Sequence, residues 1–408
     1  LEDLKKIRQT RKEDSEAGKE LLKKEIQTSN ELKAWWIDEM KTTEFPLREK
    51  MTLFWENHFV TAYQKVKVNY WIFQKNQLLR ENAFGNFKTL TKKAMQTNAM
   101  VRYLDNVDNK KGKLNENLSR ELLELFTLGI GNYSEADIKN GAKGLAGLGV
   151  GETTAMYRRF LEDNDPIEYL GKKGVLKLDE MVDAIFDHPK IPYLLTQKIL
   201  QWFLYDEPKE NLVKHYGDYF RKVNFEIKPL LIKIFTEEFA KNDTAGSKIK
   251  NPLEYILLLT SELKTQRPES TTIAFFLKQQ GMDLFNPPNV KGWDGGKSWL
   301  TSQIYLQRNN VADLLSSGKS IPRSKLEREN TLNKKQAFSI SLDWNTKGTN
   351  KEIIKELTDR LLFSTDTSLQ QDLEKILKYD FDPQSLGAND AVLRLFNAII
   401  KSPEFQLI

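Results

Sequence analysis

The sequence predicts a mainly α-helical protein: a multi-helix globular array with a small helical C-terminal subdomain and little or no sheet. Apolar residues recur along most of the chain at the spacing of three and four that is typical of amphipathic helices. Start signals precede several of these stretches. Alternation of polar and apolar residues is too short to require a sheet, and residues 337–344 are the one candidate strand.

The expected helices follow one another along the chain. Residues 4–40 indicate one or two charged helices, and Pro46 opens the next helix as a first-turn proline. Another helix has its own start signal, with Asn251 as N-cap, Pro252 at N1 and Glu254 at N3. The periodicity predicts further helices at 87–104, 114–128, 135–145, 178–186, 191–203, 211–222, 227–240, 352–362, 369–377 and 390–400.

Length and composition predict how the chain is organised. Its 408 residues exceed one simple core and suggest two or three packed subdomains. With 39% hydrophobic and 29% charged residues, the composition is that of a globular protein rather than a disordered one. We expect a main helical domain at residues 1–315, a connector at 316–351 and a C-terminal helical subdomain at 352–408.

Composition also excludes several kinds of chemistry and partner. The chain has no cysteine, which excludes disulfides, thiolate catalysis and cysteine-ligated metals. Net charge is +5, from 62 basic and 57 acidic residues, too even a balance to indicate nucleic acid. The basic run at residues 110–113 has acidic neighbours and indicates a solvated loop. The longest apolar run, 255–259, is far shorter than the ~20 residues of a membrane helix, so no transmembrane segment is expected.

The stretch KLNENLSRELLELFTLG, residues 113–129, predicts a helix with one apolar and one polar face. We expect Asn115 to be its N-cap. The polar side chains form one continuous arc of the helical wheel, here called the polar arc: Glu116, Asn117, Arg120, Glu121 and Glu124.

Four interpretations of the polar arc remain open. Glu121 and Glu124 lie three residues apart, so they are candidates for holding a divalent cation. Alternatively, one of them takes a raised pKa and acts as a general acid. The arc is otherwise an exposed, salt-bridged face, or a buried ion-pair network around Arg120 that only holds helices together.

His58 is the second candidate for catalysis. It is one of only three histidines and lies on the apolar stripe of its predicted helix, with Met51 and Phe54. A histidine in that position is either a hydrogen-bonded core residue or a proton shuttle or metal ligand. In the second case, His58 would form an acid–base pair with Glu121 or Glu124.

Two further stretches carry candidate residues. In FNPPNVKGWDGGKSWL, residues 285–300, prolines and glycines surround Asn289, Trp293 and Trp299, which predicts an ordered loop. Its tryptophans either stack against a flat or sugar-like ligand or fill the protein's own core. In LEDNDPIEYLG, residues 161–171, the acids fail the spacing of a calcium loop and indicate an acidic turn. Asp163 in this turn is a further metal candidate.

Four motifs in order resemble the bacterial domain-of-unknown-function family 1800: LREKMTLFWENHFV, NENLSRELLELFTLGIGNYSEADI, KIKNPLEY and NPPNVKGWDGGKSWL. The ending IIKSPEF is also similar to that family. The resemblance implies a mostly helical, generally exported bacterial protein with no established reaction. By position, the site-like motifs of the family fall on His58, on Asn115 and the polar arc, and on the loop 289–299.

This chain departs from the family pattern in several places. A His-Asp-x-Gly-x-Lys stretch is common in the family, and here Glu162 replaces the histidine, Ile167 replaces the lysine and Asp163 remains. Where many members have Thr-Gly-Trp, this chain has AGL at 146–148, and Phe126 stands where some members have histidine. The segment usual before Leu1 is absent, so the chain is expected to be a divergent, mature or trimmed member.

These observations lead to two function hypotheses. The first is an extracytoplasmic binding or assembly component of the cell envelope or surface, whose partner is another envelope protein or a polysaccharide. Its location is inferred from the resemblance alone. The second is a hydrolase or lyase that acts on an extracellular polymer through His58, Glu121 and Glu124, with a divalent cation as the cofactor it would use. The sequence does not decide whether the protein is an enzyme.

Overall fold

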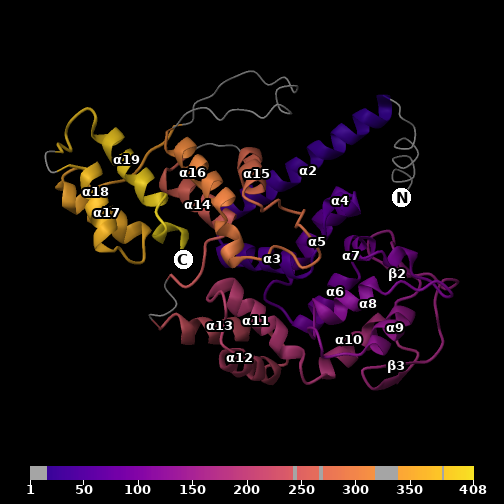
Figure 1. The fold of residues 1–408 in the computed structure, drawn as a ribbon. Helices are drawn as coiled ribbons and strands as arrows, with labels where there is room; N and C mark the ends of the chain where they lie inside the picture. The colour runs from indigo at the N-terminus through magenta and orange to yellow at the C-terminus, as the bar shows by residue number, and fades with distance from the viewer. Residues whose placement is uncertain (1–15, 242–245, 266–269, 318–338, 379–380) are drawn as a thin grey trace. The chain divides into compact units, whose positions relative to one another are not determined.

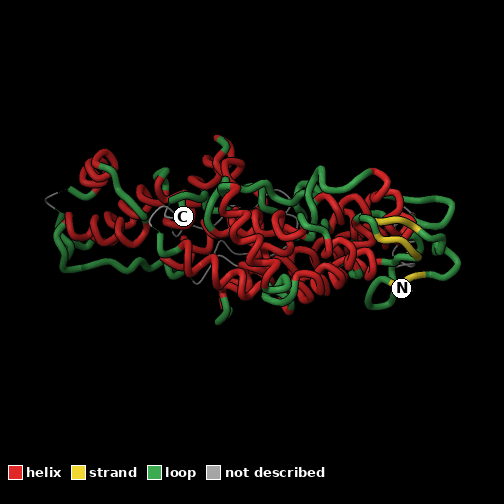
Figure 2. The backbone as a smooth tube through the Cα atoms, turned by 90° about the horizontal axis from the view of Figure 1, so that it is seen from below, coloured by secondary structure: helices red, strands yellow, loops and turns green. Residues whose placement is uncertain are grey.

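The computed structural model describes residues 16–241, 246–265, 270–317, 339–378 and 381–408 (Figure 1). Over these residues the protein is mainly α-helical, which confirms the predicted fold class. The strands that Figure 2 shows in yellow form two antiparallel sheets of two strands each. In the described part of the chain, no helix is both long enough and apolar enough to span a bilayer.

The chain forms two compact units. The first unit comprises Leu1–Lys241 and Leu284–Trp293, and the second comprises Asn242–Asp283 and Asp294–Ile408. In the second unit, α19 (Ala388–Ile400) packs on α16 (Ser302–Ser316). The last three α-helices of the chain therefore belong to the same unit as α16. The connector predicted at 316–351 falls largely outside the described residues, which omit 318–338, so the predicted domain division stays a prediction.

The first unit contains the polar arc and His58. Its first helices are α2 (Glu16–Thr42), α3 (Pro46–His58), α4 (Tyr63–Val66), α5 (Asn69–Glu81), α6 (Phe87–Met95), α7 (Asn98–Tyr103), η1 (Asn106–Asp108), α8 (Asn117–Glu124) and α9 (Glu135–Gly144). The strands follow as β1 (Leu148–Gly149), β2 (Met156–Tyr157), β3 (Ile167–Tyr169) and β4 (Lys172–Gly174). Its last helices are α10 (Leu178–Asp187), α11 (Ile191–Phe203), α12 (Glu210–Lys222) and α13 (Ile227–Glu238).

The second unit is helical in its described residues. Its elements are α14 (Pro252–Glu262), α15 (Ser270–Gln279), η3 (Gly296–Leu300), α16, α17 (Asn350–Leu361), α18 (Thr367–Ile376), α19 and η4 (Glu404–Gln406). Backbone hydrogen bonds from Lys250 N to Gln406 O (2.8 Å) and from Ile408 N to Lys248 O (2.8 Å) join the end of the chain to the segment before α14.

The capping signals account for several helix starts. Pro46 is the first residue of α3, as predicted. The predicted start of α14 is also confirmed: Asn251 accepts a hydrogen bond from Glu254 N, Glu254 accepts one from Asn251 N, and Pro252 is at N1. The first backbone N–H groups of a helix have no acceptor within the helix. The Asn251 side chain accepts from one of these groups, and a proline in the first turn has no N–H that needs an acceptor.

Other elements differ from the prediction. The helix expected at 87–104 is two helices, because the Thr97 side chain caps a new helix by accepting from Met100 N. Within the described part of 337–344, which begins at residue 339, the backbone forms no strand. The strands β1 to β4 were not predicted, since pairs of two or three residues are too short to show alternation.

Aromatic side chains form the core around α3. Trp55 is fully buried, and its ring lies 5.8 Å from that of Phe59 and 6.0 Å from that of Phe87. Its indole N–H donates to Ala83 O at 3.1 Å, so the one polar atom of the ring is satisfied. This core fixes α3, and with it the position of His58 at the last residue of that helix.

The apolar face of α8 packs against α9. Leu118, Leu122 and Leu123 are buried, which confirms the predicted apolar face. At the closest approach, the Ser119 hydroxyl donates to Ile138 O at 2.9 Å, and a Cβ on Gly141 would lie 2.2 Å from the Ser119 oxygen. This packing buries the leucines and leaves the polar arc on the other face of α8, from which Arg120 reaches Glu135 at the start of α9.

Candidate functional site

The start of α8 differs from the prediction. The helix begins at Asn117, and Glu116 occupies the capping position without a side-chain cap. Asn115 lies one residue before that position, where its own N–H donates to Asn109 Oδ1 at 3.0 Å, and its side chain still makes a capping contact with the first turn of α8. From there its side chain accepts from Asn117 N at 3.0 Å. Asn115 is therefore a turn residue that shapes the approach to the polar arc.

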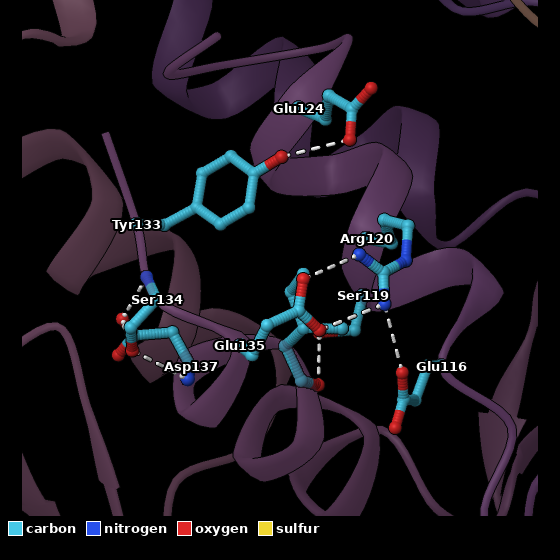
Figure 3. A network of polar contacts seen from close by, with 9 residues as sticks. Glu116, Ser119, Arg120, Glu124, Tyr133, Ser134, Glu135 and Asp137 are labelled. Carbon is cyan, nitrogen blue, oxygen red and sulfur yellow. Dashed lines mark hydrogen bonds and ion pairs between the residues drawn. The ribbon is translucent and has the colours of Figure 1, made fainter. Parts of the chain in front are cut away.

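Arg120 organises the outer part of the polar arc (Figure 3). Its guanidinium donates to Glu135 through two nitrogens, both at 3.1 Å, and to Glu116 at 3.1 Å. The Arg120 side chain is 36% exposed and that of Glu135 is 69% exposed, so this network is not buried. The interpretation of Arg120 as the centre of a buried ion-pair network is therefore wrong.

Glu121 and Glu124 form the inner part of the polar arc and differ from Glu116. Both side chains are half-buried, and no Lys, Arg or His of the described residues lies within ion-pair distance of either carboxylate. Glu124 instead accepts from the Tyr133 hydroxyl at 2.8 Å, as Figure 3 shows. Burial, reinforced by the neighbouring Glu124, raises the pKa of Glu121. Burial and Glu124 also raise the pKa of Tyr133 to about 12.

Residues from three other segments surround this carboxylate pair. Tyr103, at the end of α7, lies near enough to Glu121 for that charge to raise its pKa further, after burial. The Lys65 ammonium lies 5.4 Å from the centre of the Tyr103 ring and 2.7 Å from Asp105. The loop residue Lys291 acts on Glu121 in the opposite direction and lowers its pKa. The surface therefore presents the two carboxylates, the Tyr133 hydroxyl and ammonium groups together, whereas Tyr103 is 8% exposed.

Asn117 connects the polar arc to this neighbouring group. Its side-chain amide donates to Asp105 Oδ2 at 3.4 Å. Asp105 has a positive φ of 57° before η1, a conformation that Asp tolerates better than most residues. The amide thus links the first turn of α8 with the end of α7.

His58 lies elsewhere in the first unit. It is 2% exposed, and its Nε2 lies 3.0 Å from Phe126 O, just beyond the end of α8. Since a carbonyl only accepts, Nε2 carries the proton and donates. Its Nδ1 faces the Lys198 ammonium at 3.5 Å, and Lys198 also donates to Leu125 O at 2.8 Å.

The charged group beside His58 is therefore a cation. Burial and the Lys198 charge hold the pKa of His58 well below its usual value. The contacts that the described residues make with the imidazole include neither Glu121 nor Glu124. The predicted acid–base pair of His58 with one of these glutamates is not assembled, and His58 has the surroundings of a core histidine.

The low pKa of His58 leads to a prediction about stability and pH. The unfolded chain takes up a proton near pH 6.5, whereas the folded imidazole remains neutral to lower pH. Stability should therefore be complete above pH 6.5 and be lost as the pH falls below it. Urea unfolding between pH 7.5 and 5 measures this loss. A His58→Gln variant, which keeps the N–H donor, should have a smaller slope, whereas His215→Gln at a 54% exposed histidine should retain it.

The tryptophans of the loop 285–300 do not form an exposed stacking surface. Trp293 and Trp299 are each 6% exposed, so the alternative of core residues applies and their assignment to ligand binding is corrected. They belong to different compact units. Asn57 holds Trp293 by accepting from its backbone N–H at 2.7 Å and donating to its carbonyl at 3.3 Å. Asn289 is exposed and accepts from Lys291 N at 2.7 Å, which shapes the turn.

The metal candidate Asp163 does not join Glu121 and Glu124. Across the described residues, no three His, Asp or Glu side chains are arranged so that they could hold a metal ion. Asp163 accepts from Asp165 N at 3.1 Å and lies 3.9 Å from the Lys111 ammonium, away from the contacts of the polar arc. Glu162 pairs with Lys177 at 3.2 Å. The turn around Asp163 is thus a structural acidic turn.

Sequence reasoning did not find several residues of this region. Tyr103 and Lys65 lie in segments that show no motif of their own, and Tyr133 lies in a family motif but was not predicted as a site residue. Only the fold brings these side chains to α8. Lys198 is on the apolar helix α11, where a single lysine gives no sign that it reaches a carbonyl of α8. Tyr133 offered a weak signal, because it follows Glu124 by nine residues, just before the capping box of α9.

These features define a helical protein of two compact units with a half-buried, polar, aromatic-flanked surface on a short helix. The family described as "Protein of unknown function (DUF1800)" matches residues 1–407, and the chain belongs to it. Comparison with curated proteins finds no match. Comparison with solved structures finds none either.

Proposed function

We propose that this protein is an extracytoplasmic binding component of the bacterial cell envelope, and that the polar arc is its ligand-binding surface. One observation carries the proposal: Glu121 and Glu124 are half-buried side by side on α8, and neither has an ion-pair partner among the described residues. The Tyr133 hydroxyl and the nearby charges of Arg120 and Lys291 compensate this burial only in part, which costs stability, and such a cost is typical of sites that act on a ligand. The extracytoplasmic location is part of the proposal and follows from the family resemblance.

The chemistry of the surface favours a polysaccharide as the ligand. Carboxylates accept hydrogen bonds from sugar hydroxyls, and the amide of Asn117 and the hydroxyl of Tyr133 both donate and accept. The Tyr103 ring is 8% exposed, so it supports Glu121 from the protein side and does not contact the ligand. Lys65 and Lys291 flank the carboxylates and limit the negative potential of the surface. A neutral, polyhydroxylated chain satisfies these groups better than a strongly charged partner does.

A hydrolase or lyase acting on the same polymer is the alternative, and the raised pKa of Glu121 favours it. Burial and the neighbouring Glu124 raise the pKa of Glu121, which is the direction that a general acid requires. His58 has no part in this version, because its neighbours are Phe126 O and Lys198. Release of new reducing ends from the polysaccharide distinguishes the enzyme from the binding protein.

The Glu121→Gln variant tests the proposal. Glutamine keeps the shape of the side chain but removes the charged acceptor, so polysaccharide affinity should fall roughly tenfold or more, about 1.5–3 kcal/mol. The raised pKa of Glu121 means that its ionised form destabilises the folded protein at neutral pH. The Glu121→Gln variant should therefore unfold at a slightly higher temperature. Sedimentation with peptidoglycan sacculi and with insoluble neutral polysaccharides measures binding, and thermal unfolding measures stability.

Glu168→Gln is the matched control, since Glu168 is a 58% exposed carboxylate that pairs with Lys173 outside the arc. It should leave binding unchanged. Equal binding by wild type and Glu121→Gln would contradict the assignment of the surface. Absence of binding to every polysaccharide in the set would contradict the ligand class.

A further inference from the structure

Two β-turns lie side by side next to β2. In the first, Leu161 N donates to Arg158 O at 2.8 Å, so Arg159 and Phe160 occupy the two corner positions. In the second, Lys110 and Lys113 exchange backbone hydrogen bonds of 3.1 and 2.9 Å, and Gly112 at a corner has φ +78°. We call residues 110–114 and 156–161 the turn pair.

Backbone hydrogen bonds fix the turn pair to the body of the first unit. Lys111 N donates to Leu161 O at 2.9 Å, which joins one turn directly to the other. Gly147 forms the common base, since its N–H donates to Asn109 O at 2.9 Å and its carbonyl accepts from Arg158 N at 3.0 Å. The turns therefore hold a defined shape without help from their side chains.

Large apolar side chains project from the turn pair. Phe160 is 84% exposed, Met156 is 57% exposed and Leu114 is 40% exposed. An exposed phenylalanine at the corner of a turn gains nothing from the fold, because it leaves its apolar surface in water. Several such side chains on adjoining turns indicate a surface that is covered by something else.

The same turns are basic. The positive side chains are Lys110, Lys111, Lys113, Arg158 and Arg159, and all of them are exposed. Lys111 pairs with Asp165 at 3.2 Å, whereas the other four have no ion-pair partner among the described residues. Of the acids next to the two turns in sequence, Glu162 is engaged by Lys177 and Asp108 is exposed. The turn pair thus combines a net positive charge with an apolar apex.

We infer that the turn pair is a membrane-contact site that docks the first unit on an anionic phospholipid surface. Phe160 and Met156 would enter the interfacial region, while the long stems of Arg158 and Arg159 allow their charges to remain at the headgroups. Each basic side chain near an anionic leaflet adds to the attraction, and the complementary charge selects phospholipids of negative charge. Projecting turns suit a flat, deformable surface rather than a groove. The inference is independent of the ligand assigned to the polar arc.

Vesicle binding tests the inference. The full chain should sediment with phosphatidylcholine–phosphatidylglycerol vesicles, bind pure phosphatidylcholine vesicles far less, and detach as salt is raised. An Arg158→Ser, Arg159→Ser double variant should bind the anionic vesicles roughly tenfold more weakly or worse. Phe160→Ser should also bind more weakly, whereas Phe239→Ser, at a phenylalanine just after α13 that is 60% exposed, should not.

A second measurement locates the contact. The chain has no cysteine, so Phe160→Cys provides a single site for an environment-sensitive fluorophore. Its emission should shift to the blue on anionic vesicles, and the same label at Phe239→Cys should not shift. Equal binding by wild type and the Arg158→Ser, Arg159→Ser variant would overturn the inference. So would a label at 160 that responds to soluble polyglutamate but not to vesicles, because the occupant would then be an acidic polymer.

Discussion

Replacing Lys75 with alanine is expected to destabilise the first unit by about 3–5 kcal/mol. The Lys75 ammonium is fully buried and lies 2.6 Å from Glu56 Oε2 and 2.7 Å from Phe59 O. Burial lowers the pKa of Lys75, and the Glu56 charge opposes that effect. Without Lys75, the Glu56 carboxylate at 5% exposure would lose its counter-charge and retain only a weak hydrogen bond from Asn76 at 3.3 Å. Urea unfolding measures the change in free energy.

Lys214→Ala is the matched control for burial. Lys214 pairs with Asp218 at the same 2.6 Å, but the two side chains are 71% and 51% exposed, so the loss should stay within about 0.5 kcal/mol. A Glu56→Gln, Lys75→Met double variant should be more stable than Lys75→Ala, because it removes both buried charges. If Lys75→Ala were no less stable than Lys214→Ala, the ion pair would not contribute to the fold as described.

Local signals in the sequence predicted where helices begin, but they did not predict which elements pack against each helix. Pro46 and Asn251 mark helix starts because capping depends on a few adjacent residues. Thr97 carries the same kind of signal, yet the apolar periodicity runs through it, and the break between α6 and α7 was missed. The partner of His58 is the carbonyl of Phe126, which any residue would supply, so no sequence pattern indicates it.

Because sequence patterns report only on neighbouring residues, they predicted some features of the candidate site and missed others. Helical periodicity placed the polar arc on one face of α8, because that relation lies within one element. Whether Arg120 and Glu121 are exposed depends on α9 and on the segments around Tyr103 and Tyr133, which are distant in sequence. The tryptophans of the loop show this most directly, since glycines and prolines predict a turn but do not tell whether Trp293 faces solvent or the core.

Because the chain forms two compact units, a substitution that destabilises one unit should reduce the stability of that unit and not of the other. A chain with two cores need not unfold in a single transition, so one global free energy does not describe it. Lys75 belongs to the first unit, where it joins α5 to the end of α3. The corresponding buried cation of the second unit is Arg308 on α16, which has a different set of partners.

Arg308→Ala is expected to destabilise the second unit by about 3–5 kcal/mol. Arg308 is fully buried, donates to Gln406 Oε1 at 3.0 Å and to Lys250 O at 2.7 Å, and lies over the Tyr255 ring at 5.0 Å. Burial lowers its pKa to about 10, so the side chain remains a cation at neutral pH. Its removal would leave a cavity and two unsatisfied acceptors where α16, α14 and the end of the chain meet.

Hydrogen exchange read by mass spectrometry tests this prediction unit by unit. Arg308→Ala should lose amide protection in α14, α16 and α19, while α3 and α5 of the first unit keep theirs. Arg308→Lys should fall between wild type and Arg308→Ala, because an ammonium keeps the charge but lacks the fork that reaches both acceptors. Lys355→Ala, which breaks an exposed pair with Asp359 in the same unit, should change nothing measurable. Equal loss of protection in both units would contradict the independence of the two cores, and unchanged protection in α16 would show that Arg308 does not hold the second unit together.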